Sequence, residues 1–110
     1  MSNNTSLKLF GCRNNQLTSL DVSKNTELTE FGCDKNRISR LDVSNNNMLD
    51  GLYCDFNILS SDNLNNLFES LHSNPPSSEF WGKRISISGN PGADECNVSI
   101  AENKGWIVYK

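Results

Sequence analysis

A pattern of apolar residues, cysteine and asparagine occurs three times in this chain at a fixed spacing of 21 residues. The copies begin at Leu7, Leu28 and Leu49, and in each the apolar residues, the cysteine and the asparagine stand at the same offsets. The second half of the period also returns, because Leu20-Asp21-Val22-Ser23 is repeated as Leu41-Asp42-Val43-Ser44. An internal repeat of roughly 20 to 50 residues is typical of proteins whose successive turns of chain stack on one another. The repeat therefore predicts a solenoid.

Each copy contains a short alternating stretch that predicts a β-strand. In the middle copy Phe31 and Cys33 point to one face of such a strand and Asp34 points to the other. Copies one period apart should then pair in parallel register. The asparagine that follows each strand, Asn36 in the middle copy, stands where the chain must turn out of the sheet. We expect its side-chain amide to bond neighbouring backbone groups, and the later Leu-Asp-Val-Ser segment to close the core from behind.

The cysteines of the repeat are expected to be buried thiols. Cys12, Cys33 and Cys54 occupy one position in successive copies, so they should stack on adjacent strands about 4.8 Å apart. A disulfide between such in-register neighbours would be strained, so each Cys should replace an inward Leu. The alternative is a three-thiolate metal site, which lacks the close ligand pairs and the nearby histidine of most zinc sites. We expect no metal and no cofactor, and we place Cys96 on a helix outside the ladder.

Composition permits one small domain and argues against two classes of partner. The chain has 110 residues, of which 35% are apolar, enough for a modest core. A net charge of -3 and a pI near 5.0 give no positive field that would attract nucleic acid or an anionic membrane. No apolar run could span a bilayer, and residues 1–6 have no signal-peptide character. We expect neither nucleic-acid binding nor membrane insertion.

The period is lost after Leu59, so residues 60–110 are predicted to form a C-terminal cap on the repeats of residues 1–59. Leucines and a phenylalanine at helical spacing predict a helix over 62–72, with Ser61 or Asp62 as its N-cap and His72 favourably placed at its C-terminal dipole. Alternation predicts strands near 83–88 and 106–109, and a second helix is expected over 94–103. Trp106 should shield the last turn of chain.

The chain opens in the middle of a period, because residues 2–7 correspond to residues 23–28. Terminal repeats of such arrays normally differ from the others and carry a polar outer face. We therefore expect this chain to be the C-terminal part of a longer protein. Its first turn would expose an uncapped N-terminal edge through which copies could self-associate.

The pattern LxxLxCxxNxLxxLDVSxN, carried by residues 7–25 and 28–46, resembles the leucine-rich repeats, and in particular their 21-residue bacterial class, the Bacteroidetes type. The resemblance implies an α/β fold: a right-handed curved solenoid with a short parallel sheet on its concave face and a helix-containing C-terminal cap. It also implies binding of a protein or glycan on that face, in a protein exported to the cell surface.

The candidate binding residues are those that the alternation directs away from the core. Aromatic and arginine side chains on such a surface commonly carry binding energy. The alternative is that the charged side chains contact only solvent and one another, and that the Phe56 ring packs into its own turn. We also expect Lys83, Ser86 and Ser88 to point outward on the fourth strand. The predicted concave-face set is Arg13, Glu30, Asp34, Lys35, Tyr53, Asp55, Phe56 and Arg84.

Catalysis is not expected. Asp34 and Asp55 should be neighbours, and one carboxylate could raise the pKa of the other, as an acid–base pair requires. Carboxylates in register are equally expected on a binding face, where Arg13 would offset their repulsion. His72, the only histidine, has no serine or cysteine partner in the pattern. The prediction is a non-catalytic binding module; the alternative is a structural cap of a longer cell-surface protein with no binding site of its own.

Overall fold

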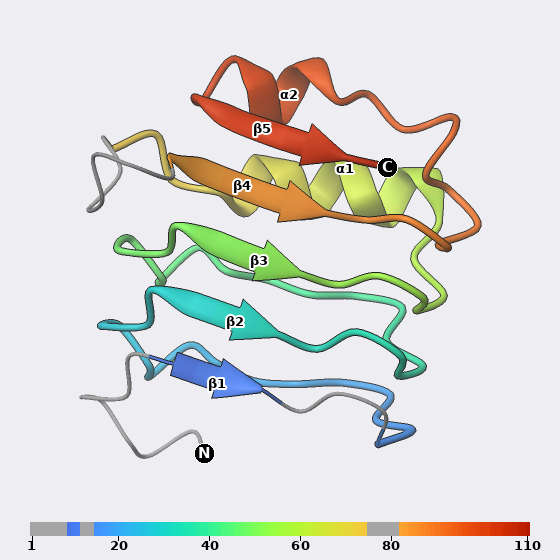
Figure 1. The fold of residues 1–110 in the computed structure, drawn as a ribbon, viewed down its shortest axis with the longest axis horizontal. Helices are drawn as coiled ribbons and strands as arrows, with labels where there is room; N and C mark the ends of the chain where they lie inside the picture. Colours follow the sequence, from blue (N-terminus) through green and yellow to red (C-terminus); the bar gives the residue numbers. More distant parts are fainter. Residues whose placement is uncertain (1–8, 12–14, 75–81) are drawn as a thin grey trace.

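The computed structural model describes residues 9–11, 15–74 and 82–110, which form a mixed α/β fold (Figure 1). Five strands pair in parallel and in chain order within one sheet. Two helices complete the described part, α1 at Ser61–Ser70 and α2 at Ser99–Glu102. The strands are β1 at Leu9–Gly11, β2 at Glu30–Gly32, β3 at Gly51–Tyr53, β4 at Lys83–Ser86 and β5 at Trp106–Tyr109.

The register of the sheet follows the sequence period. Phe31 of β2 lies opposite Leu52 of β3, 21 residues later. Leu52 lies opposite Ile85 of β4, although the two residues are not one period apart and α1 now lies between the two strands in sequence. All three side chains are fully buried. The parallel strands were therefore predicted correctly, and the expected strands near 83–88 and 106–109 correspond to β4 and β5.

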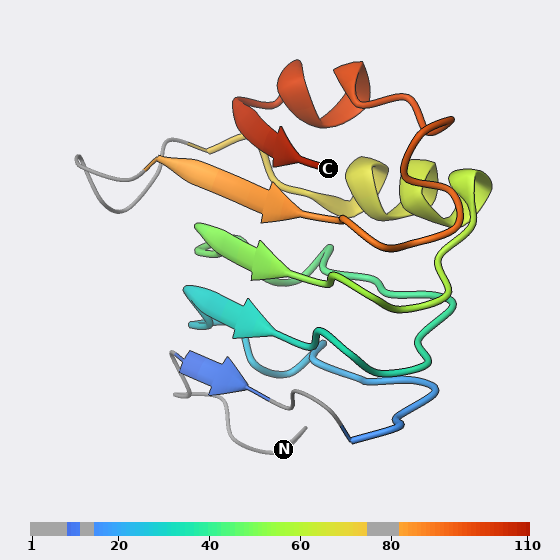
Figure 2. The ribbon, with the colours of Figure 1, turned by 45° about the vertical axis from the view of Figure 1, so that its right-hand side comes forward.

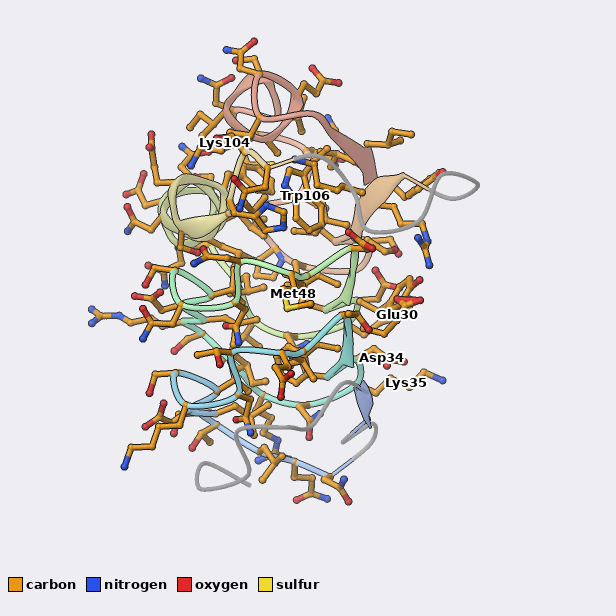
Figure 3. The ribbon with its side chains drawn as sticks, turned by 90° about the vertical axis from the view of Figure 1, so that its left-hand side faces the viewer. Glu30, Asp34, Lys35, Met48, Lys104 and Trp106 are labelled. Atoms are coloured by element: carbon orange, nitrogen blue, oxygen red, sulfur yellow. The ribbon has the colours of Figure 1, made fainter. Side chains whose placement is uncertain are left out.

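Both helices lie on one side of the sheet (Figure 2). Leu64, Leu67 and Phe68 of α1 are fully buried and belong to the same core as Phe31 and Leu52. Glu30, Asp34 and Lys35 lie on the other side of the sheet, away from α1 (Figure 3). We call this uncovered side of the sheet the open face.

Asparagine amides join successive turns of chain where the strands end. The Oδ1 of Asn36 accepts hydrogen bonds from the backbone N–H groups of Asn15 and Leu17, each at 2.9 Å, and its Nδ2 donates to carbonyls of its own turn. Asn57 and Asn90 bond the turn before them in the same way. These amides are buried and satisfy backbone groups that no strand pairs. The predicted role of the asparagines is confirmed.

The residue before each amide has a left-handed backbone. Lys35 has φ 59° and Phe56 has φ 56°, and Gly89 has φ 77° at the corresponding place in the next turn. This conformation costs a residue with a Cβ about 1–2 kcal/mol. The turn that aims the amide at its neighbours is therefore strained wherever it lacks glycine.

The first helix differs from the prediction at both ends. Its N-cap is Ser60, whose hydroxyl oxygen accepts from the N–H of Asn63 at 3.2 Å, so the predicted caps Ser61 and Asp62 were wrong. The helix ends at Ser70 rather than at residue 72. Its last carbonyls, those of residues 68, 69 and 71, accept from the Nζ of Lys104 at 3.2, 2.5 and 2.9 Å. Lys104 thus has the C-terminal role that was expected of the histidine.

The second helix is much shorter than the expected 94–103. Asn97 interrupts it, because its Oδ1 accepts from the N–H of Ser99 at 3.2 Å and the helix begins only there. Cys96 therefore lies in a turn rather than on a helix, where burial raises the pKa of its thiol.

The strand cysteines within the described residues are buried. Cys33 and Cys54 are fully buried, and neither forms a disulfide. Burial, with a smaller effect from the neighbouring Cys33, raises the pKa of the Cys54 thiol well above its usual value. The predicted burial is confirmed for both residues, and the raised pKa agrees with the predicted protonated state of Cys54. Cys12, the third member of the proposed metal alternative, lies outside the described residues.

Candidate binding surface

An ion pair crosses three strands at one end of the open face. Glu30 of β2 and Arg84 of β4 both lie opposite Gly51 of β3 in the register. Their side chains meet above that glycine, with Oε1 2.8 Å from Nη2. A Cβ at position 51 would overlap the Glu30 carboxylate. The pair therefore depends on glycine in the strand between its two partners.

Tyr53 completes this arrangement. The guanidinium carbon of Arg84 lies 5.9 Å from the centre of the Tyr53 ring, within the range of a cation–π contact. Burial alone would lower the pKa of Arg84, but the Glu30 carboxylate and Tyr53 more than offset it, so this pKa is raised. Glu30, Gly51, Tyr53 and Arg84 thus form a prearranged charged unit, which we call the Glu30–Arg84 cluster.

Two serines of the next turn of chain hold the side chain of Asp55 in place. Its Oδ1 accepts from the hydroxyl of Ser86 at 2.6 Å and from the backbone N–H of Ser88 at 3.0 Å. The expectation that these serines belong to the open face beside Asp55 agrees with these bonds. These two donors hold the carboxylate in one orientation.

Apolar side chains extend the open face over the last strand. Ile107 and Tyr109 are 52% and 53% exposed and lie opposite Arg84 and Ser86. The sequence reasoning treated β5 only as part of the cap and missed both. The sequence did contain this information. If Trp106 points inward, the alternation of side chains along a strand directs residues 107 and 109 outward.

The predicted binding residues divide into three groups. Glu30, Asp34, Tyr53, Asp55 and Arg84 lie on the open face, as predicted. Two others, Lys35 and Phe56, lie in the left-handed turns that follow the strands, and Lys35 is on the same side of the sheet as the open face (Figure 3). Phe56 is 55% exposed, and its ring covers Gly89, where a Cβ would overlap it. Arg13 lies outside the described residues.

Lys83 was predicted to point outward, and this was wrong. It is 3% exposed, because it alternates on the same side as Ile85. Its Nζ donates to the carbonyls of Asn74 and Lys104, each at 2.6 Å, and lies 5.6 Å from the Trp106 ring centre. These carbonyls offset the cost of burying the charge. Burial lowers the pKa of this lysine.

The ring of His72 contacts the same tryptophan, Trp106, as Lys83 does. Its Nε2 lies 2.6 Å from the carbonyl of Leu49, and its Nδ1 accepts from the N–H of Asn74 at 3.1 Å. Its ring packs edge-on against Trp106, with centroids 5.6 Å apart. Burial, partly opposed by the Leu49 carbonyl, lowers the pKa of His72. Both nitrogens of the neutral ring are thus bound by backbone groups, and its expected role at the helix dipole was wrong.

Across residues 9–11, 15–74 and 82–110, no three His, Cys, Asp or Glu side chains gather as metal ligands do. The helices of this described part are too short or too polar to cross a bilayer. No protein-family model matches the chain, and no curated protein is significantly similar to it.

Proposed function

We propose that this chain is a non-catalytic recognition module of the leucine-rich-repeat type, which binds a protein or glycan on the open face of its sheet. The parallel strands at a 21-residue period and the asparagine ladder support a right-handed solenoid of this class. The proposed setting is a bacterial cell surface or the extracellular space, and the N-terminal edge is the proposed route of self-association.

The Glu30–Arg84 cluster is the observation that carries the proposal. Its charges are already oriented before a ligand arrives, so little conformational entropy is lost on binding. Exposed Ile107 and Tyr109 lie on the adjacent strand and offer apolar contact. A surface with fixed polar groups beside aromatic and aliphatic anchors has the character of a recognition interface.

The structural-cap alternative is supported by a different observation. Tyr53 contacts Arg84, and the ring of Phe56 covers Gly89, so both aromatic anchors touch residues of the 60–110 region. Such contacts would also be expected if these side chains only joined the repeats to a cap that ends a longer array.

A binding screen with surface variants separates the two functions. The chain is immobilised and tested by biolayer interferometry against bacterial and host surface proteins and polysaccharides. The double variant Phe56→Asn with Tyr109→Ser removes exposed aromatic area, and asparagine tolerates the left-handed turn at position 56. Met48→Ser is the matched control, because Met48 is 43% exposed but lies away from the open face (Figure 3).

We expect the double variant to weaken any captured ligand by at least about tenfold, equivalent to about 1.4 kcal/mol, and the control to bind as the parent does. Equal binding by the double variant would refute Phe56 and Tyr109 as anchors of the proposed site. If the parent chain captured nothing from the panel, the cap alternative would be favoured instead.

A further inference from the structure

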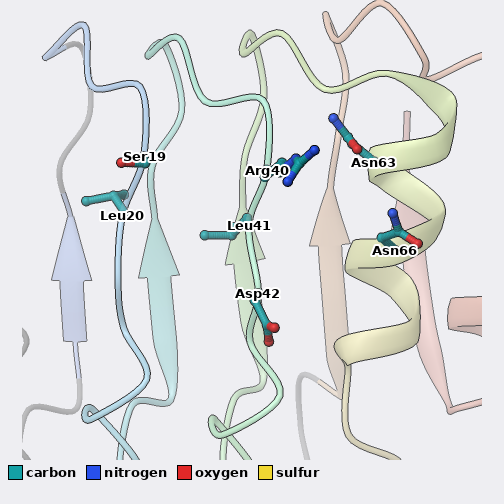
Figure 4. Close-up of a pocket in the computed structure, with 7 residues that line it drawn as sticks. All are labelled: Ser19, Leu20, Arg40, Leu41, Asp42, Asn63 and Asn66. Carbon is teal, nitrogen blue, oxygen red and sulfur yellow. The ribbon is translucent and has the colours of Figure 1, made fainter.

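A hollow of about 520 Å³ lies on the side of the molecule opposite the open face, between the segment 40–42 and α1 (Figure 4). Leu20 and Leu41 line it with their side chains turned away from α1, and Ser19, Arg40, Asp42, Asn63 and Asn66 complete the lining (Figure 4). Its volume falls within the roughly 300–1,000 Å³ typical of small-ligand sites. We call it the back groove.

The groove arises where the repeat gives way to the helix. Arg40, Leu41 and Asp42 stand one period after Ser19–Asp21, and the two segments run side by side without helical turns. One period further on, α1 begins at Ser61. The helix buries its apolar residues in the core and turns Asn63 and Asn66 toward the segment. A polar helix face thus stands where the pattern would place another Leu-Asp-Val-Ser segment.

Hydrogen bonds join the segment to α1 at each end of the groove but not in its middle. At one end the Nδ2 of Asn63 donates to the carbonyl of Ser39 at 2.6 Å. At the other, the N–H of Val43 donates to the hydroxyl of Ser70 at 3.2 Å. In an extended segment the backbone groups of every second residue point to the same side. The N–H and C=O of Leu41 should therefore face α1, as the carbonyl of Ser39 and the N–H of Val43 do. Within the described part of the chain they have no hydrogen-bond partner.

One positive and one negative side chain, those of Arg40 and Asp42, line the groove. Arg40 is exposed and extends toward α1, and it pairs with no carboxylate among the described residues (Figure 4). The carboxylate of Asp42 is instead engaged by its own turn, because its Oδ1 accepts from the N–H of Ser44 at 2.8 Å. Hydrogen bonds from the Ser44 hydroxyl and, to a smaller extent, from the Ser44 backbone N–H lower the pKa of Asp42, so the group stays charged and turned to Ser44.

We propose that the back groove binds the C-terminal end of an extended peptide. The Arg40 guanidinium would bind the terminal carboxylate, as its planar donor geometry favours. The N–H and C=O of Leu41 would pair with the last peptide group, in the manner of strand addition. The side-chain amide of Asn66, which makes no hydrogen bond with the other described residues, would bond the preceding carbonyl.

The test uses N-acetyl-alanyl-leucine and its C-terminal carboxamide as matched probes, titrated into the ¹⁵N-labelled chain and followed by NMR. We expect saturable shifts of the Leu41 backbone and Asn66 side-chain amides, with a Kd on the order of 1 mM for the free acid. The carboxamide should bind at least about tenfold more weakly, as should the free acid to the Arg40→Gln variant. Arg37→Gln is the control, because Arg37 is exposed on the same turn but does not line the groove.

Equal affinity for the acid and the carboxamide, equal losses in the two arginine variants, or no saturable shift at the Leu41 and Asn66 amides would each overturn the proposal. None of these variants touches the open face. Failure here therefore leaves the proposed function standing, and the reverse also holds.

Discussion

Replacing Gly51 by alanine should uncouple Glu30 from Arg84 while leaving the fold intact. A Cβ at this position would overlap the Glu30 carboxylate, which is the flexible end of a side chain and can swing into solvent. The ion pair is partly exposed, with side-chain exposures of 20% for Arg84 and 35% for Glu30, so we assign it about 0.5–1 kcal/mol. Reduced freedom of the unfolded chain favours alanine by about 0.5 kcal/mol. The net change in unfolding free energy should therefore stay within about 0.5 kcal/mol.

The coupling itself can be measured with a double-mutant cycle of Glu30→Gln and Arg84→Gln, using urea unfolding. In the parent chain the two changes should couple by about 0.5–1 kcal/mol. In the Gly51→Ala background the coupling should fall below about 0.3 kcal/mol. If the coupling were the same in both backgrounds, glycine would not be what lets the pair form, and the reasoning would be refuted.

Three further changes test other parts of the structure. Lys104→Met should lower the unfolding free energy by about 1–2 kcal/mol, because it removes the donor to three carbonyls at the end of α1. The control is Lys24→Met at an exposed position, which should lower it by less than about 0.5 kcal/mol in the same urea assay. Lys35→Gly should stabilise by about 0.5 kcal/mol, since relief of the left-handed turn exceeds the added chain entropy; a loss in melting temperature would contradict this. His72 has a lowered pKa when folded, so its contribution is complete above the unfolded pKa of about 6.5 and is lost as pH falls below it. The melting temperature should drop between pH 7.5 and 5.5, and a His72→Gln variant should lose that dependence, because the chain has no other histidine.

The repeat predicted those features whose causes lie within one period. Strand alternation placed Phe31 and Cys33 in the core, and the period itself set the parallel register. The role of Asn36 followed because a buried turn must satisfy its own backbone groups. These features need only local pattern and stacking, and both can be read from one chain.

The incorrect predictions concern contacts between distant segments. The donor to the end of α1 is Lys104, more than thirty residues beyond the helix in sequence. Lys83 was assigned to the wrong face because a lysine was assumed to be outside, although its alternation with Ile85 placed it inside. The Glu30–Arg84 pair spans 54 residues and depends on a glycine between the strands, so no local pattern could reveal it.

The asparagine ladder has a consequence for how such a chain can change length in evolution. Each amide bonds backbone groups at equivalent positions of the turn that precedes it, although Asn90 follows Asn57 by 33 residues instead of 21. Duplicating or excising one whole period of 21 residues leaves every amide facing equivalent partners. Adding or losing one or two residues between a strand and its asparagine would instead leave buried amides and backbone groups unpaired, at about 1–3 kcal/mol each. Selection should therefore tolerate the duplication or loss of whole periods and remove changes that alter the distance from a strand to its asparagine, which makes array length a freely varied property of this architecture.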